Sequence, residues 1–543
     1  MNKRISTFAK VIAVAICVAM ILATLCACGL AGGGGFSKPN GGNTGSSTNP
    51  DDSNAGGNTG GNTGGNTQNP DCTHADANDD GKCDKCQTNV IVELDFYAIN
   101  DLHGMYSQTE TQPGVAGLTT YLKTKQQSEN AIVLASGDMW QGSSESNNTK
   151  GKLATEWLNY VNCSSMTLGN HEFDWSTEKI RINARLATFP MLAINVYEHA
   201  TNQRATYCQS SVIVEKGGIK IGIIGAIGDC YSSISASMST DVYFKTGSAL
   251  TALIKAESDR LKEDGADYIA LSIHDGYAGS SYDLQEIQDS KMNWYDASLS
   301  NGYVDVVFEG HTHRSYMLVD SYGVKHIQAG GYNDAVSHAD VSVNIANGNK
   351  TTNVDIVRNS VYSSFEKDDI IDRLTAKYAN EIGNPDEVVG YNGDYRSSDQ
   401  LKRLMVQAYW EKGKTVWGGD YDIVLAGGYI SVRDPYYLPS GNVTMRQIQT
   451  LFPFDNQMHL CKITGRVLLN RYFNNKNYVY VYDEKIKTKL ESGQGLNDYY
   501  YIVTDSYNTD YAPNKLTMVK TLGDSFFPRD CLAEYIAAGN LAS

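Results

Sequence analysis

The chain has 543 residues, of which 41% are hydrophobic and 20% charged; this composition is typical of a soluble globular protein, and the length predicts two sizeable domains with extensions. Its formal net charge of −16 argues against a nucleic-acid polymer as partner, because no basic stripe offsets the acidic excess. The eleven cysteines are scattered and odd in number, which excludes a dense disulfide framework but leaves room for one or two bridges.

The first 28 residues predict an export signal that ends in a lipid-attachment site. A basic start is followed by an apolar run over residues 11–25 that is too short to serve as a membrane-spanning helix. The run ends in Leu-Cys-Ala-Cys, which resembles the bacterial lipoprotein box with Cys28 as the lipidated residue. Ordinary cleavage that leaves an unmodified thiol is the alternative. We expect a protein exported and held by lipid alone to the outer face of a bacterial cell membrane.

Two short segments separate the leader from the body of the chain. Residues 29–71 are rich in Gly, Asn, Ser and Thr and predict a flexible tether without secondary structure. Residues 72–89 form a small module whose residue types suit a tetrahedral zinc site. Within it, residues 76–81 match the start of a calcium loop, but Gln87 stands where that loop needs a bidentate glutamate. A disulfide-stapled turn is the other alternative. The four candidate zinc ligands are Cys72, His74, Cys83 and Cys86.

From residue 90 onward, apolar strands alternate with segments of helical spacing. The alternation predicts a mixed α/β fold with a largely parallel sheet, and strands at 325–329 and 339–345 predict a second sheet packed on the first. We expect a first domain over residues 90–357, a hinge near 355–365, a second domain over 358–523 and a tail over 524–543. The expected helices lie at 114–130, 150–162, 176–188, 247–265, 368–379, 399–412, 444–451 and 529–538.

Five apolar strands in the first domain end at once in residue types that bind metals. A lone histidine on an apolar strand is more often a core residue, and a lone aspartate after a strand is usually a turn former. Five such endings hold five of the ten histidines, and the ends of strands are where open α/β sheets carry their chemistry. The five segments read Asn-Asp-Leu-His-Gly at 100–104, Ser-Gly-Asp-Met at 136–139, Gly-Asn-His-Glu-Phe-Asp at 169–174, His-Asp-Gly at 274–276 and Glu-Gly-His-Thr-His at 309–313.

In order and spacing, these segments resemble the motifs of the calcineurin-like metallophosphoesterase superfamily. Within it the chain resembles the secreted 5′-nucleotidase family, which includes UDP-sugar hydrolases and 2′,3′-cyclic nucleotide phosphodiesterases. The resemblance covers about residues 93–523 and is much more specific for the first domain than for the second. It implies a four-layer α/β/β/α catalytic domain followed by a second α/β domain that binds the substrate.

The resemblance also implies a centre of two divalent ions that activate water and clamp phosphoryl oxygens. Mixed histidine, asparagine and aspartate ligands suit zinc, manganese, cobalt or iron. His171 would stabilise charge on the phosphoryl group, and Asp174 would orient it. The first ion would be bound by Asp101, His103 and His313, the second by Asn170, His274 and His311, and both would be bridged by Asp138.

In the second domain the family's substrate segments are only partly present. Phe454 and Tyr507 are the candidates for two rings that would sandwich a base, although each is as plausible as a packing residue. The family's Asn-Gly-Gly-Gly-Ile-Arg is replaced by Ala-Gly-Gly-Tyr-Ile-Ser at 426–431, so Arg433 or Arg396 is a candidate substitute for the lost arginine. The family's ribose-binding Gly-Gly-Asp-Gly is replaced by Tyr-Ala-Pro-Asn at 511–514.

The complete ligand set predicts an active metal-dependent phosphoric ester hydrolase. Its expected substrate is a small phosphorylated compound, a 5′-nucleotide or a related metabolite. A 2′,3′-cyclic nucleotide phosphodiesterase or nucleotide-sugar hydrolase is the alternative among enzymes. A surface ligand-binding protein on a retained phosphoesterase fold is the alternative from another class, but such a role would not require the bridging Asp138 or the pair of His171 and Asp174. The sequence predicts no oligomeric state.

Overall fold

The computed structural model describes residues 74–541, except 110–111, 280–281, 287, 292–293, 512–514 and 524–525. The expected signal segment with Cys28, the tether and Cys72 lie outside the described residues, as does most of the segment expected to replace the ribose-binding motif. None of the helices in the described part of the chain combines the length and the apolar character needed to cross a membrane.

The first sheet of the body has six strands in the order β15-β14-β1-β2-β3-β4. Strands β1 to β4 run parallel, and β14 pairs with β1 in the antiparallel direction. Side chains of β1 alternate between two cores, with Phe96 on one side and Tyr97 on the other, because successive residues of a strand face opposite ways. The strands are β1 (Ile91–Ile99), β2 (Ala131–Ala135), β3 (Ser165–Thr167), β4 (Met191–Leu192), β14 (Ala335–Asn344) and β15 (Lys350–Arg358).

A seven-stranded second sheet packs on the first through an apolar layer. Phe96 and Leu134 from the first sheet meet Ile223, Tyr268 and Phe308 from the second in this layer. The second sheet has the order β10-β12-β13-β11-β9-β7-β6. Its strands are β6 (Ser211–Lys216), β7 (Ile219–Ile227), β9 (Tyr268–His274), β10 (Tyr282–Glu286), β11 (Val306–Phe308), β12 (Ser315–Val319) and β13 (Lys325–Ala329), and β5 (Val196–Glu198) pairs with β8 (Val242–Phe244) beside it.

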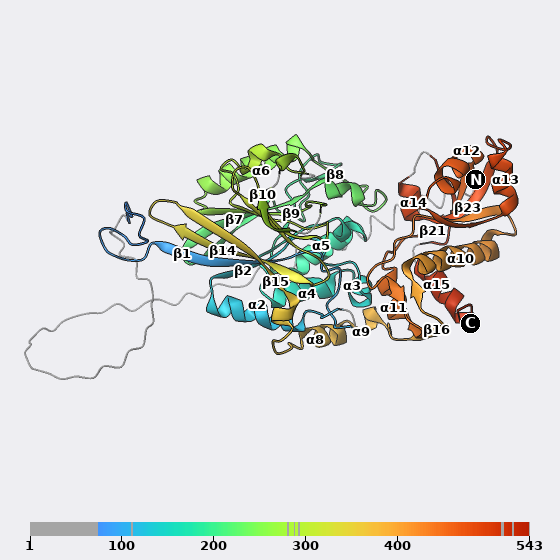
Figure 1. Ribbon diagram of the computed structural model, residues 1–543, viewed down its shortest axis with the longest axis horizontal. Helices are drawn as coiled ribbons and strands as arrows, with labels where there is room; N and C mark the ends of the chain where they lie inside the picture. Colours follow the sequence, from blue (N-terminus) through green and yellow to red (C-terminus); the bar gives the residue numbers. More distant parts are fainter. Residues whose placement is uncertain are drawn as a thin grey trace, which may run out of the picture. The chain divides into compact units, whose positions relative to one another are not determined.

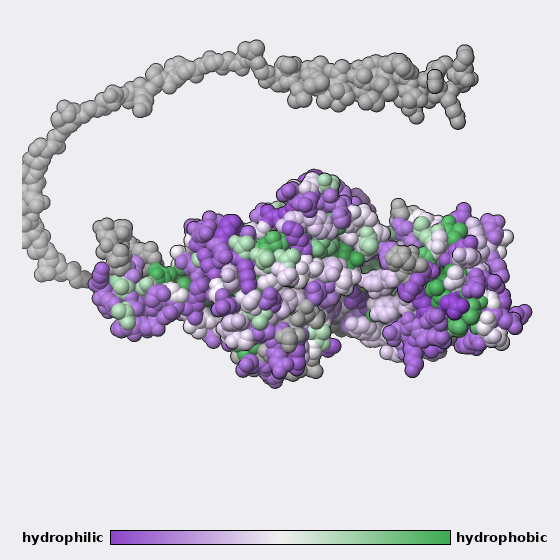
Figure 2. Space-filling model, turned by 90° about the horizontal axis from the view of Figure 1, so that it is seen from above, coloured by the Kyte–Doolittle hydropathy of each residue, from purple (hydrophilic) through white to green (hydrophobic). Residues whose placement is uncertain are grey.

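Helices cover the outer faces of both sheets, which completes the predicted α/β/β/α arrangement (Figure 1). Helix α6 (Ser248–Glu263) packs on the second sheet through Leu250, Ile254 and Leu261. Figure 2 shows a mostly hydrophilic face with apolar residues in scattered patches, as expected when the apolar side chains fill cores. The helices on the first sheet are α2 (Ala116–Ser128), α3 (Ser144–Thr149), α4 (Lys152–Tyr160), α5 (Thr177–Leu186) and α7 (Asn359–Tyr362).

The chain does not leave the first core at the hinge expected near residues 355–365. Strand β15 continues to Arg358, and α8 (Ile370–Lys377) and α9 (Ala379–Ile382) bury Leu374 and Ile382 against the first core. The change of core therefore follows Ile382. The amphipathic pattern of α8 predicts a buried face, but it does not say which of two cores that face contacts.

The second domain has a five-stranded sheet in the order β22-β18-β23-β21-β24 between two cores. Helix α10 (Ser398–Trp417) begins with a capping box in which Ser397 N donates to Gln400 Oε1 at 2.8 Å. The helix expected in a separate tail is α15 (Pro528–Ala537), which packs beside α10 and buries Leu532 in the same core. The remaining elements are β16 (Val388–Asn392), β17 (Arg396–Ser397), β18 (Ile423–Gly428), β19 (Tyr437–Leu438), β20 (Gly441–Thr444), α11 (Met445–Leu451), β21 (Met458–Thr464), α12 (Gly465–Leu468), β22 (Val479–Tyr482), α13 (Glu484–Glu491), β23 (Tyr499–Asp505), α14 (Ser506–Asp510) and β24 (Thr517–Thr521).

Candidate metal centre and substrate cleft

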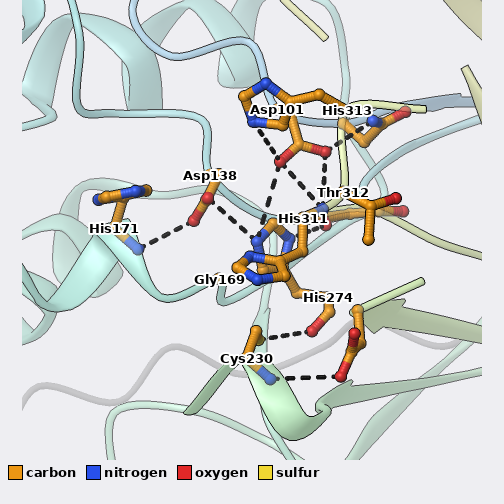
Figure 3. A network of polar contacts seen from close by, with 12 residues as sticks. Asp101, Asp138, Gly169, His171, Cys230, His274, His311, Thr312 and His313 are labelled. Atoms are coloured by element: carbon orange, nitrogen blue, oxygen red, sulfur yellow. Dashed lines mark hydrogen bonds and ion pairs between the residues drawn. The ribbon is translucent and has the colours of Figure 1, made fainter. Parts of the chain in front are cut away.

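The structure brings the seven predicted metal ligands to one edge of the two sheets, at or just past the ends of β1, β2, β3, β9 and β11. Figure 3 shows Asp101, Asp138, His274, His311 and His313 of this set. Ligand atoms of Asp101, His103 and His313 lie within 4.8 Å of one another, and so do those of Asp101, Asp138 and His274. The two aspartates therefore occupy the middle of the cluster. Asn170, His311 and His313 also line the cavity described below.

The imidazoles aim their Nε2 atoms at one another and at the carboxylates. His103 Nε2 lies 3.0 Å from His313 Nε2, and His313 Nε2 lies 3.3 Å from Asp101 Oδ1. On the other side, His274 Nε2 lies 3.1 Å from Asp138 Oδ2 and 3.9 Å from Asp101 Oδ1. These directions converge on the space between the side chains, which is the arrangement of ligands around a cation.

Backbone carbonyls fix the orientation of two of these imidazoles. His103 Nδ1 lies 3.0 Å from Gln141 O, and His274 Nδ1 lies 2.7 Å from Ser136 O. A carbonyl only accepts, so each Nδ1 donates and each Nε2 is left to face the cluster. This pairing of a ligand's second nitrogen with a carbonyl is typical of metal-bound histidine.

Burial and charge at this edge match the needs of a bound cation. Asn170 Oδ1 is buried and has no hydrogen-bond partner among the described residues, although a buried carbonyl oxygen normally has one. Burial, together with the neighbouring His274, lowers the pKa of His311 to about 4, which keeps it in the neutral form that binds metals. Burial also lowers the pKa of His274, but Asp138 and Asp101 outweigh it and raise that pKa to about 10. The residues present fit divalent metal ions.

Five of the seven ligands have backbone φ angles between +48° and +71°. This left-handed region costs a residue with a side chain about 1–3 kcal/mol, and such strain concentrates at functional sites. Gly169 makes room beside them, since a Cβ there would lie 2.3 Å from Asp138 Oδ1. The five strained residues are Asp101, His103, Asp138, His311 and His313.

Glu172 is a site residue that the sequence analysis did not assign. Its fully buried carboxylate accepts hydrogen bonds from Gly169 N at 2.7 Å, Met139 N at 2.9 Å and Asp138 N at 3.0 Å. It thereby ties the loop after β2 to the loop after β3. Burial, with the nearby Asp138 charge, raises the pKa of Glu172 to about 7. Its position inside a motif of ligands was the signal in the sequence.

A second buried network holds the loop that carries His311 and His313. Glu309 Oε1 lies 3.0 Å from His326 Nδ1, and His326 Nε2 lies 3.2 Å from Asp320 Oδ2. Burial acts to lower the pKa of His326, but the two carboxylates raise it to about 9. A protonated imidazole between two carboxylates therefore fixes the start of this loop.

His171 and Asp174 stand beside the cluster as the sequence predicts. His171 Nδ1 lies 2.8 Å from Asp174 Oδ2, and His171 N donates to Asp138 Oδ1 at 2.9 Å. Burial lowers the pKa of His171, but Asp174 and Asp138 outweigh it and the net pKa is raised. From the second domain, Arg433 Nη2 lies 3.2 Å from His171 Nε2. These groups bring positive charge and hydrogen-bond donors to the rim of the metal cluster.

A cavity of about 310 Å³ joins this rim to the second domain. Of the four predicted substrate-binding residues, Phe454, Tyr507 and Arg433 line it. Arg396 does not; it lies on β17 and donates through Nε to Asn392 Oδ1 at 3.2 Å. The Phe454 ring stands 5.6 Å from the His171 ring, with the Arg433 guanidinium 5.1 Å from its centre; a base held between Phe454 and Tyr507 stays a prediction.

Three tyrosines, Tyr429, Tyr507 and Tyr511, line the cavity together and are called the aromatic wall below. The Tyr507 ring centre lies 4.5 Å from that of Tyr511 and 6.0 Å from that of Tyr429. Sequence reasoning missed Tyr429 and Tyr511 as candidates. Both occupy segments that depart from the expected motifs, so the departures themselves were the available signal.

Charged contacts join the two domains around the cavity. Lys150 and Arg529 both pair with the carboxylate of Asp455, and Arg446 pairs with Glu145. Burial acts to raise the pKa of Asp455, but the two cations outweigh it and hold that pKa below its ordinary value. The carboxylate is therefore charged at neutral pH and bridges a loop of the first domain to a helix of the second.

Comparisons with known proteins agree with this geometry. Residues 94–315 match the family described as calcineurin-like phosphoesterase. An apyrase from Tabanus yao is 27% identical over 421 residues, which cover 70% of this chain and 72% of the relative. A 5′-nucleotidase from Vibrio cholerae is 24% identical over 431 residues, covering 70% of this chain and 74% of that protein. The fold is similar to a 5′-nucleotidase precursor from Thermus thermophilus, with a TM-score of 0.62, 16% identity, and coverage of 82% of this chain and 96% of that one.

Proposed function

Because this chain carries a calcineurin-like phosphoesterase domain and is a metal-dependent phosphoric ester hydrolase homologous to 5′-nucleotidases, we propose that it removes phosphate from 5′-nucleotides. The proposal rests on one cavity that is lined both by predicted ligands of the metal cluster and by the tyrosines of the aromatic wall. A nucleotide has the matching chemistry, with a phosphate at one end and a flat π-system at the other.

The first domain supplies the hydrolytic end. Two divalent ions held by the seven ligands would lower the pKa of water and neutralise phosphoryl oxygens. His171, oriented by Asp174, directs Nε2 into the cavity where charge develops on the phosphoryl group. Arg433 occupies the same place from the second domain. It supplies the positive charge that the missing arginine of the 426–431 segment would have provided.

The second domain supplies the recognition end. Tyr429, Tyr507 and Tyr511 offer π-faces for stacking on a base. Phe454 packs beside His171 and Arg433, so we assign it to the phosphate and ribose end. Arg396 is not part of this proposal, because it lies outside the cavity lining.

A phosphate-release screen of the purified chain tests the proposal. The panel contains 5′-, 3′- and 2′,3′-cyclic nucleotides, nucleotide sugars and sugar phosphates, each with added Mn²⁺ or Zn²⁺. We expect the highest kcat/KM with a 5′-nucleotide. Preference for a cyclic nucleotide or a nucleotide sugar would assign the chain to the alternative reactions of the same fold. Tight ligand binding without turnover in any metal would instead support a binding protein.

The proposal also places the enzyme outside the cytoplasm, attached through lipid at Cys28. This part rests on the basic start, the apolar run and the Leu-Cys-Ala-Cys sequence at residues 25–28. Labelled palmitate fed to bacteria that express the chain should be incorporated into it. Cys28→Ala should abolish the label and release the protein from membranes; equal labelling of both forms would contradict the assignment.

A further inference from the structure

Ahead of β1, residues 74–89 form a compact module outside the catalytic cleft. An isolated bridge between Lys82 and Asn89 closes its base. One ligand atom each from His74, Cys83 and Cys86 lies within 4.8 Å of the others, and His74 Nδ1 is 3.4 Å from Cys86 Sγ. Cys83 is fully buried, and the other two are half-buried. Two sulfurs and an imidazole nitrogen at this spacing are the donor set of a structural zinc site.

Backbone hydrogen bonds hold the three donors in place. Cys83 N donates to Thr88 O at 2.8 Å, and Gln87 N donates back to Cys83 O at 2.8 Å, which closes the Cys-x-x-Cys turn. Asp84 N donates to Ala75 O at 2.7 Å and so brings the segment that carries the imidazole against the turn. Backbone hydrogen bonds thus hold the turn and the segment of His74 side by side.

The acidic residues of the same module are engaged elsewhere, which argues against calcium. Asp76 accepts from Asp80 N at 3.1 Å, from Gly81 N at 3.0 Å and from Asn344 Nδ2 at 2.8 Å. Asp79 accepts from Asn347 Nδ2 at 3.0 Å. These carboxylates therefore dock the module on the turn between β14 and β15. Calcium would need six to eight oxygens directed at one point.

We propose that His74, Cys83 and Cys86 bind a structural zinc ion that is distinct from the catalytic metals. Zinc in structural sites takes four ligands. Three of these come from the described residues; Cys72, which the sequence analysis also named, lies outside the described residues. The ion links His74 to the Cys-x-x-Cys turn. Because Asp76 and Asp79 dock the module on the turn between β14 and β15, the ion stabilises a module that is part of the body.

Cobalt substitution of the full-length protein separates this site from the catalytic centre. Thiolates bound to Co²⁺ give an intense near-ultraviolet charge-transfer absorption, whereas the seven predicted catalytic ligands include no sulfur. We expect the absorption in the wild-type protein after metal removal and cobalt loading. We expect its loss in the double variant Cys83→Ser/Cys86→Ser, together with the loss of one zinc per chain in elemental analysis of protein purified without added metal.

Cys230→Ser is the matched control, because the Cys230 sulfur lies within 4.8 Å of ligand nitrogens of His274 and His311. This variant should keep the absorption; loss of the absorption in Cys230→Ser alone would move the thiolate site to the catalytic centre and overturn the proposal. Phosphate release by the double variant should persist, which shows that the body is folded. Thiol titration of protein purified without reductant is the last measurement. A disulfide between Cys83 and Cys86, together with a zinc content equal to that of the double variant, would also overturn the proposal.

Discussion

The metal edge and the aromatic wall line one cavity but are built in different ways. Asp101, Asp138 and His274 are at most 1% exposed, and most of the ligand set is held in left-handed backbone. Tyr429 and Tyr507 are 44% and 36% exposed. Hydrolysis needs particular atoms at fixed positions, and the metal edge holds them there at the cost of backbone strain. Stacking needs only a flat surface at roughly the right distance, so the wall can be assembled from different residues.

Asp138→Asn should have the largest effect on activity, because it removes the negative charge between the two sets of metal ligands. We expect phosphate release to fall by well over 100-fold, because changing even an outer partner of a metal ligand costs about 10–100-fold. Bound metal should fall with it. The exposed Asp340 on β14 provides the matched control, and Asp340→Asn should be neutral in both elemental analysis and activity. A fully active Asp138→Asn would contradict the bridging assignment.

His171→Ala tests the rim without touching a ligand. Removing a group that stabilises transition-state charge costs about 10²–10³-fold in kcat, and we expect that loss with unchanged metal content. His199, which is exposed, is the control for removing a histidine. A metal-dependent rate that stays at the wild-type level in His171→Ala would contradict the function assigned to His171.

Glu172→Gln asks whether the strained edge depends on the buried carboxylate that ties two of its loops. The amide nitrogen of glutamine cannot accept, so either Asp138 N and Gly169 N, which share Oε2, or Met139 N, which donates to Oε1, would be left without an acceptor. We expect apparent metal affinity to weaken by about 10–100-fold, as for other supporting partners of metal sites. Titration of activity with Mn²⁺ measures this, and recovery of kcat at saturating metal would distinguish positioning from catalysis.

The aromatic wall should give the smallest change and a different pattern. Loss of one stacked ring costs about 1–3 kcal/mol, so Tyr507→Ala should raise KM for a 5′-nucleotide by about 5–150-fold and leave turnover of a small aryl phosphate unchanged. Tyr507→Phe should restore KM. Arg396→Ala should leave KM and kcat unchanged for both substrates. Equal losses of kcat/KM with both substrates in Tyr507→Ala would show that the aromatic wall stabilises the fold and does not bind the base.

The two sides of the cavity also differ in how far the sequence predicted them. Each metal ligand lies within a few residues of its own apolar strand, so local pattern placed all seven at one edge. Tyr511 lies one helical turn after Tyr507, but Tyr429 meets Tyr507 only after the second domain folds, and no periodicity marks that meeting. Glu172 was hidden for a related reason, because its partners are backbone amides of distant loops. Phe454 lines the cavity with Tyr507, but its contact with the His171 ring crosses between the domains and could not be predicted from local pattern.

Strand β1 sets the distance between the docked module and the predicted metal ligands. The module enters β1 at Ile91, and Asp101 and His103 follow its other end at Ile99. Nine residues of extended strand span about 30 Å, so the point where the chain enters the body and the metal edge of the cavity are at opposite ends of the same strand. Whatever precedes the module therefore joins the body far from the metals.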